Sequence, residues 1–268
     1  MTFRLGKDVK VHPTARINVE HGFIGDRSTV LANAVIEGRE VRIGHEARIR
    51  EYAQIGGGSC FEHTSILEAG DFLHLGNFTV LNQGAGLKIG HECACGVGTR
   101  IFTHGAYESV WDGFPAQWGS VSIGDRVFLP YALINPNVSI GDNVVVATMS
   151  LVNRDLPSGC FAGGVPCRVL KENAYPRKLS YAEKQSLFDR IFSESVQIYN
   201  SNQNHPNAKI SYEQIDEDVF SIEGTTFDLA KRTIDGVANE ISEVLKNQLR
   251  RNGIRFRYYA KDGAYVKW

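Results

Sequence analysis

The stretch Val121-Ser122-Ile123-Gly124-Asp125 is repeated as Val138-Ser139-Ile140-Gly141-Asp142, and this repetition decides the fold. Each copy has an apolar residue, any residue, an apolar residue, glycine and then a small polar or charged residue. Earlier copies are Ile24-Gly25-Asp26 (truncated), Val41-Arg42-Ile43-Gly44-His45, Phe72-Leu73-His74-Leu75-Gly76-Asn77 and Leu87-Lys88-Ile89-Gly90-His91. A motif that recurs this often along one chain indicates a repeat architecture rather than a set of isolated turns.

The spacing of the apolar residues identifies the kind of repeat. They recur every six positions, in the series Ile24, Val30, Ile36; Ile43, Ile49, Ile55, Phe61; and Ile89, Cys95, Ile101. Period six predicts a parallel β-helix, in which each flat side buries one apolar residue and each corner is a tight turn with glycine. Three sides make a coil of about eighteen residues, and coils stack because one coil cannot bury its own face. The spacing is imperfect at 56–74, which we interpret as a slipped coil, and at 102–120, which we interpret as a loop outside the prism.

Length and composition exclude several classes of protein. The 268 residues suffice for one or two domains, and a formal net charge of −1 gives no sign of nucleic-acid binding or of an anionic membrane partner. No apolar stretch approaches the ~20 residues of a membrane span, and the N-terminus lacks the apolar run of a signal peptide. The five cysteines have no zinc-type spacing, and Cys95 falls on a core position. We therefore expect a cytoplasmic protein.

The repeat pattern ends near residue 173. A capping box at Ser180 predicts a helix to about Tyr199, and a second amphipathic helix is expected over about 236–251, with short strands between and after them. We therefore predict a β-helix domain at 1–173, with the loop at 102–120, and a small α+β domain at 174–268.

The loop at 102–120 carries the strongest candidate for chemistry. A loop of this length is expected to be functional or mobile. His104 lies at its root, and aromatic residues follow at Tyr107, Trp111 and Trp118. These rings are suited to stacking on a sugar or covering a thioester.

Four stretches then resemble a known family. They are Val127-Phe128-Leu129-Pro130, Asn135-Pro136-Asn137-Val138-Ser139-Ile140-Gly141-Asp142-Asn143, Ala147-Thr148-Met149-Ser150-Leu151-Val152-Asn153-Arg154-Asp155-Leu156-Pro157 and Gly164-Val165-Pro166-Cys167-Arg168-Val169. Together with His104 and the loop, they are similar to the hexapeptide acyltransferases, in particular the galactoside and maltose O-acetyltransferases. The resemblance covers about residues 9–172.

The resemblance implies a left-handed β-helix, a homotrimer and acetyl-CoA bound in a groove between two subunits, with no metal. It implies that His104 is the general base and that Asn82 lies near the acceptor oxygen; a turn-stabilising role for Asn82 is the alternative. It further implies donor contacts at Phe128, Thr148, Asn153, Arg154, Arg168 and Lys171. Phe128 stands where the family often has tryptophan, and Thr148 where it often has alanine.

We therefore predict an acetyl-CoA-dependent O-acetyltransferase that modifies a sugar hydroxyl of a surface polysaccharide or glycoconjugate. N-acetylation of an amino sugar is the alternative within the class. A γ-carbonic anhydrase would need Gly-His-x4-His, but Arg50 and Gly96 occupy the fifth positions after His45 and His91. A non-catalytic β-helix scaffold is the third alternative, and the His104 loop argues against it.

Overall fold

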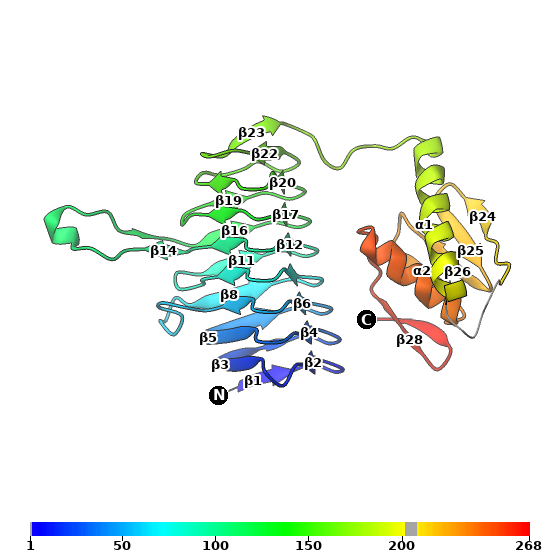
Figure 1. Cartoon of the computed structure of the whole chain (residues 1–268), viewed down its shortest axis with the longest axis horizontal. Coiled ribbons are helices and arrows are strands. Elements are labelled where there is room, and N and C mark those ends of the chain that lie inside the picture. The colour runs from blue at the N-terminus through cyan, green and yellow to red at the C-terminus, as the bar shows by residue number, and fades with distance from the viewer. Residues whose placement is uncertain (1, 202–207) are drawn as a thin grey trace. The chain divides into compact units, whose positions relative to one another are not determined.

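The structure is a computed structural model that describes residues 2–201 and 208–268. The chain divides into two compact units, Met1–Arg177 and Lys178–Trp268. The first unit is a stack of short β-strands and the second contains both helices (Figure 1).

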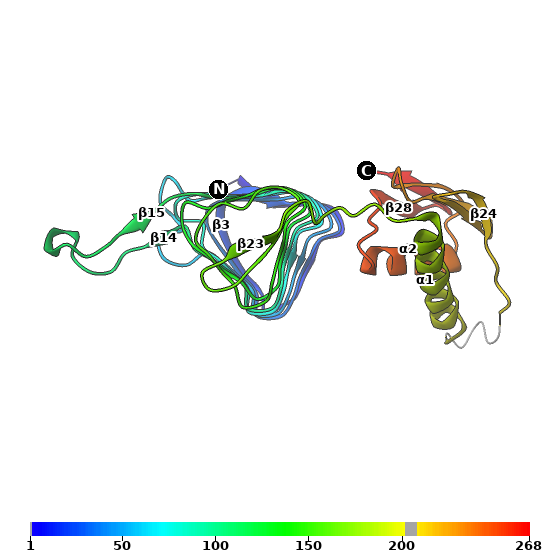
Figure 2. The same ribbon diagram turned by 90° about the horizontal axis from the view of Figure 1, so that it is seen from above.

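The first unit is a three-sided prism of parallel strands. Seen along the stack, successive coils superpose into a triangle (Figure 2). Each face is a ladder in which a strand pairs with the equivalent strands of the coils before and after it. The predicted coiled parallel sheet is confirmed, and its left hand stays a prediction.

The strands fall on three faces. Face 1 consists of β2 (Lys10–Val11), β4 (Thr29–Val30), β6 (Arg48–Ile49), β9 (His74–Leu75), β12 (Ala94–Cys95), β17 (Phe128–Leu129), β20 (Val145–Val146), β22 (Phe161–Gly163) and the antiparallel β23 (Arg168–Lys171). Face 2 consists of β7 (Gln54–Ile55), β10 (Val80–Leu81), β13 (Arg100–Ile101), β18 (Leu133–Ile134), β21 (Leu151–Val152) and the first halves of β3 (Arg16–Ile24) and β5 (Val35–Ile43). Face 3 consists of β1 (Thr2–Leu5), β8 (Ile66–Ala69), β11 (Leu87–Ile89), β16 (Val121–Ile123), β19 (Ser139–Ile140) and the second halves of β3 and β5.

The period-six side chains fill the inside of the prism. Ile43, Ile49 and Ile55 are fully buried, and Cys95 is 1% exposed, as predicted. Burying one such aliphatic side chain contributes about 1.5–3 kcal/mol, so the stacked core is the main source of stability. Phe61 is the exception: it is 44% exposed, because the chain has left the prism at this point.

The corner between face 3 and face 1 carries a continuous hydrogen-bond ladder, and we call it the ladder corner. The backbone N–H of the residue that follows the glycine at this corner donates to the side chain of its counterpart in the next coil, as from Asp125 to Oδ1 of Asp142 at 2.8 Å. The predicted copy at 72–77 does not belong to this corner, because its Gly76 follows β9 on face 1, and Gly70 and Asp71 take that place in the ladder. The same link joins Lys7 to Asp26, Asp26 to His45, His45 to Asp71, Asp71 to His91, His91 to Asp125 and Asp142 to Ser158. Glycine precedes these residues because the next coil lies too close for a side chain: a methyl carbon on Gly124 would lie 2.8 Å from the backbone nitrogen of Asp142.

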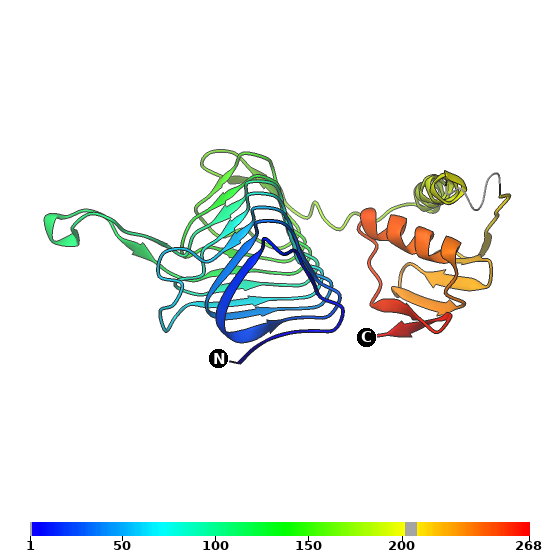
Figure 3. The same cartoon turned by 60° about the horizontal axis from the view of Figure 1, so that its bottom comes forward.

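The corner between face 2 and face 3 is irregular, and we call it the insertion corner. In one coil the chain crosses it directly, over Leu81–Leu87. In the preceding coil it needs Ile55–Leu67 to reach the equivalent position, and in the following coil Ile101–Val121. Both detours project from the same edge of the prism (Figures 1 and 3). The predicted slipped coil is therefore wrong, because the chain makes an outward loop and then resumes in register; the loop predicted at 102–120 is present.

The second unit is an α+β fold with its own core. Its elements are α1 (Tyr181–Ser201), β24 (Glu213–Asp216), β25 (Val219–Ile222), β26 (Thr225–Asp228), β27 (Thr233–Gly236), α2 (Glu240–Arg251), β28 (Tyr258–Lys261) and β29 (Ala264–Lys267). Strands β24 to β27 form an antiparallel sheet, and Phe188, Phe227 and Leu245 are buried in the core. In the described ranges, neither helix has the length and apolar character needed to cross a membrane.

Candidate active site

His104 stands at the insertion corner, where the chain leaves face 2 for its longest excursion. The strand β14 (His104–Gly105) pairs with β15 (Gln117–Trp118), and this short stem brings the two ends of the loop together. The imidazole of His104 stacks on the indole of Trp118, with ring centroids 4.5 Å apart and planes within 11°. The stack holds the imidazole in one orientation.

The two ring nitrogens of His104 have different surroundings. Nδ1 is buried and has no hydrogen-bond partner in the described part of the chain. It packs against Gly84, where a methyl carbon would lie only 3.0 Å away. Nε2 faces Gly58 and, unlike Nδ1, is not among the buried unpartnered atoms, so it is the more accessible of the two nitrogens.

Asn82 ties the coils of this corner together. Its Nδ2 donates to the carbonyl of Gly58 at 3.0 Å. Its Oδ1 accepts a hydrogen bond from the backbone N–H of Gly84 at 3.2 Å, and the one hydroxyl proton of Thr103 lies between this oxygen, at 3.2 Å, and the backbone carbonyl of Asn82, at 3.0 Å. Because the residue is only 6% exposed and its bonds join Gly58, Gly84 and Thr103, Asn82 fastens the backbone around His104. This geometry fits the turn-stabilising alternative better than direct contact with an acceptor.

The shorter insertion passes beside Nε2 of His104. It begins with Gly56 and Gly57, whose φ values of 124° and 111° are rarely adopted by other residues. Gly58 follows and presents only its backbone to His104. Cys60 is buried, and this burial raises the pKa of its thiol, so the sulfur stays protonated and is a poor nucleophile. The thiol of Cys60 is therefore not a candidate for the chemistry of this corner.

The aromatic residues of the long loop are distributed along it. Trp118 contacts His104, but Tyr107 and Trp111 are 98% and 95% exposed. They lie on the projecting arm, beyond the stem formed by β14 and β15; Trp111 belongs to a short 3-10 helix, η1 (Val110–Asp112) (Figure 1). Within one chain, only Trp118 of these three forms a wall beside the histidine in the described residues.

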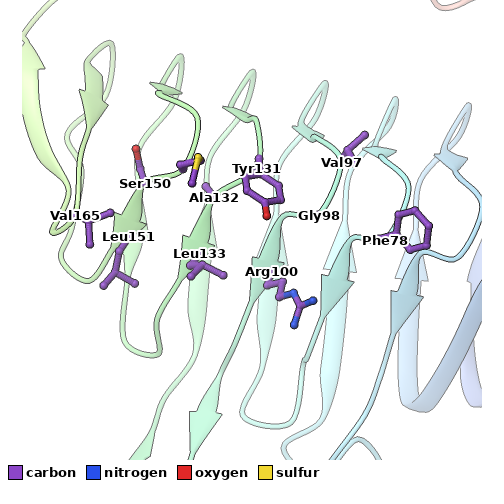
Figure 4. A pocket seen from close by; sticks show the side chains of 11 residues that line it. Phe78, Val97, Gly98, Arg100, Tyr131, Ala132, Leu133, Ser150, Leu151 and Val165 are labelled. Carbon is purple, nitrogen blue, oxygen red and sulfur yellow. The ribbon is translucent and has the colours of Figure 1, made fainter.

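A separate groove runs along face 2, beside the corner that joins it to face 1 (Figure 4). Its volume is ≈ 680 Å³. It is lined by Phe78, Val97, Gly98, Arg100, Tyr131, Ala132, Leu133, Met149, Ser150, Leu151 and Val165. The lining is mainly apolar, and Arg100 is its one charged residue.

Several groove residues have an unusual backbone. Phe78, Tyr131 and Met149 have φ values of 59°, 51° and 60°, which cost about 1 kcal/mol or more for residues of this size. Their side chains are at least half exposed. Positive φ also occurs at Arg126 and Asn143 on the ladder corner, so it belongs to the turn of the repeat. The feature typical of a binding surface is the group of bulky apolar side chains exposed along the groove. Tyr131 and Met149 thus line the groove with exposed side chains.

The six residues predicted to contact the acyl donor lie in three places. Phe128 is on β17 and Thr148 is at the corner next to the groove, and both are exposed. Asn153–Arg154 are exposed at the insertion corner after β21. Arg168 and Lys171 are exposed on β23, at the end of the prism. None of the residues that line the groove was among the predicted site residues, although the large side chains at corner positions, such as Tyr131 and Met149, were a visible signal.

The histidines considered for a metal are part of the ladder corner. Nδ1 of His45 accepts a hydrogen bond from the backbone N–H of Asp26, and Nδ1 of His91 accepts one from Asp71. Across the described ranges no group of three or more histidine, cysteine, aspartate or glutamate side chains is arranged to hold a metal ion. Both histidines therefore have a structural role in stacking the coils.

A hexapeptide prism with a histidine at a corner loop is the arrangement expected of the acyltransferases that the sequence resembles, and sequence comparison finds relatives with such names. The chain is 45% identical over 53 residues to galactoside O-acetyltransferase of Escherichia coli, a match that covers 19% of this chain and 26% of that protein. It is 43% identical over 100 residues to the putative acetyltransferase YvoF of Bacillus subtilis, covering 36% and 55%. The matches span about a quarter to a half of these relatives' own length. No protein-family model matches the chain.

Among solved structures, the chain is similar to a mutant of AntD, an N-acyltransferase from Bacillus cereus, in complex with dTDP and coenzyme A. The identity is 21% and the TM-score 0.46, over 71% of this chain and 91% of that chain.

Proposed function

We propose that this protein is an acyltransferase that moves an acetyl group from acetyl-CoA to a hydroxyl of a sugar, in the modification of a surface polysaccharide or glycoconjugate. The observation that carries the proposal is His104, whose imidazole is held by Trp118 with Nε2 open to substrate. The acetyltransferase relatives of the sequence supply the reaction class.

In the proposed reaction, Nε2 of His104 takes the proton of the acceptor hydroxyl as its oxygen attacks the thioester carbonyl. The tetrahedral intermediate collapses with cleavage of the carbon–sulfur bond, and the imidazolium returns the proton to the CoA thiolate. Histidine suits both steps because its ordinary pKa of about 6.5 is close to neutrality. A positioned base of this kind contributes about 10²–10⁴-fold.

For the donor, we propose that the apolar groove on face 2 takes the acyl and pantetheine parts of acetyl-CoA, and that Phe128, Thr148 and Asn153–Arg154 border this path. Arg168 and Lys171 would pair with the CoA phosphates, since cations suit that role. Groove and histidine lie at different corners of one prism. This separation supports a homotrimer in which the histidine of one subunit works beside the groove of the next; the left hand of the helix is proposed from the resemblance to the hexapeptide acyltransferases.

For the acceptor, we propose that Trp118 stacks on the sugar ring and that the exposed Tyr107 and Trp111 reach it or the neighbouring subunit. Aromatic faces suit sugars because they bury the apolar side of the ring.

The test is release of free thiol from acetyl-CoA by the full chain, with a panel of sugars, amino sugars and nucleotide sugars. A productive acceptor should gain the mass of one acetyl group. Treatment with alkaline hydroxylamine then separates the chemistries, because it cleaves an O-acetyl ester and leaves an N-acetyl amide. Thiol release at background level with every acceptor would contradict the proposal and favour a scaffold.

Arg168 tests the donor site separately. Arg168→Ala should raise the KM for acetyl-CoA about tenfold with little change in kcat, because it removes a contact made equally in the ground and transition states. The effect should shrink with acetyl-dephospho-CoA if Arg168 pairs with the 3′-phosphate. An unchanged KM would reject this role.

A further inference from the structure

The space in front of the open nitrogen of His104 is bounded by one glycine. Gly58 belongs to the shorter insertion, two coils before His104. A methyl carbon on Gly58 would lie 3.5 Å from Nε2 and 4.0 Å from Cε1 of His104, and no other described atom outside residues 57–59 would lie within 4 Å. A side chain at this position would therefore point into the space that Nε2 faces.

The backbone at Gly58 does not itself require glycine. Gly56 and Gly57 have positive φ angles, but Gly58 is not among the residues with positive φ. The contacts of the added methyl group would be ordinary van der Waals contacts. The fold would accept alanine here, so the reason for an absent side chain lies in the space beside His104.

Gly58 is also fixed in place. Its carbonyl accepts the hydrogen bond from Nδ2 of the buried Asn82. The other end of the insertion is held where the hydroxyl of Thr64 donates to the carbonyl of Gly84 at 2.7 Å. Because both ends are anchored, an added methyl group could not easily swing away from Nε2.

We propose that Gly58 is a specificity-determining residue that keeps open the position of the acceptor's nucleophilic atom. A general base must lie within about 2.6–3.2 Å of the atom it deprotonates. The nucleophile and the carbon that carries it must therefore enter the space beside Nε2 that a methyl group on Gly58 would fill. The inference rests on the proposed function for its substrate, but its geometry can be tested without any reaction.

The first test is chemical modification of His104. Diethyl pyrocarbonate reacts with the unprotonated nitrogen of an exposed imidazole, and peptide mass spectrometry can follow the rate at His104 alone. In Gly58→Ala this rate should fall about tenfold. Gly105→Ala is the matched control: Gly105 adjoins His104, has nothing within 4 Å of an added methyl group and lacks a positive φ. The modification rate of His104 in Gly105→Ala should equal that in the chain without substitutions.

The second test uses acetyl transfer and distinguishes the two proposals. Gly58→Ala should lower kcat/KM for the acceptor about tenfold or more, with the KM for acetyl-CoA and the melting temperature unchanged. If His104 is modified at the same rate in Gly58→Ala, in Gly105→Ala and in the chain without substitutions, the role of Gly58 is overturned, even if acetyl transfer depends on His104. If His104 is modified more slowly in Gly58→Ala but the chain transfers no acetyl group, the role of Gly58 in limiting access to Nε2 stands. The proposed reaction is then overturned.

Discussion

The ladder corner and the insertion corner are built by the same coils but differ in how regularly the coils pair there. At the ladder corner the described coils make the same turn, and the backbone N–H after the corner glycine is satisfied by a side chain of the next coil, as between Asp125 and Asp142. At the insertion corner two coils leave the prism on either side of a regular one. The atoms brought together there, Nε2 of His104 and the backbone of Gly58, have no such repeated partners.

The difference shows where a repeat protein can place chemistry. A corner that repeats uses its polar groups to stack the coils, so it has little left for a ligand. A corner that departs from the repeat can bring together residues from three coils, here Gly58, Asn82 and His104, and leave a reactive atom open. Stability should therefore depend on the ladder corner, and turnover on the insertion corner.

The largest effect should follow from His104→Ala. We expect kcat to fall about 10²–10⁴-fold, because the general base is lost, with CoA binding and the melting temperature nearly unchanged. The measurement is steady-state thiol release with the acceptor found in the screen.

His45→Ala is the matched control at the ladder corner. It removes the acceptor of the Asp26 backbone N–H and should lower stability while kcat stays the same. A normal rate for His104→Ala, or an equal loss of rate in the two variants, would break the functional contrast between the corners.

The sequence predicts the ladder corner well for a physical reason. The geometry at Gly124 and Asp125 recurs coil after coil, so the sequence repeats the same residues and the period can be counted. The same counting failed at Phe61, because a period continued across a loop assigns an inward position to a residue that is outside the prism.

The insertion corner could be predicted only in part. The length of the loop and the position of His104 at its root indicated this histidine as a candidate. Neither feature gave an indication of Gly58, because this glycine belongs to no repeated motif. Its position matters only because the stacking of the coils places it beside an imidazole two coils later. Tyr107 and Trp111 were expected to bind substrate, and in the single chain they are exposed on the arm beyond the stem of β14 and β15.

The next effect in size should come from Gly124→Ala at the ladder corner. The methyl carbon would lie 2.8 Å from the backbone nitrogen of Asp142 and closer still to its carboxylate, so the coils must separate. We expect a loss of about 2–3 kcal/mol in the free energy of unfolding, measured by urea denaturation. Gly105→Ala at the insertion corner should change it by less than about 0.5 kcal/mol. Similar losses in the two variants would mean that close coil contact does not distinguish the corners.

The smallest effect should come from removing one link of the ladder. Asp142→Ala takes away the oxygen that accepts the backbone N–H of Asp125 and should cost about 1 kcal/mol in the free energy of unfolding. Asp142→Asn keeps an acceptor oxygen in the same place and should recover most of this loss, which separates the hydrogen bond from the negative charge. Equal losses in the two variants would assign the effect to the charge. Because Asp125 and Asp142 lie at the ladder corner, neither substitution of Asp142 should change the kcat of acetyl transfer.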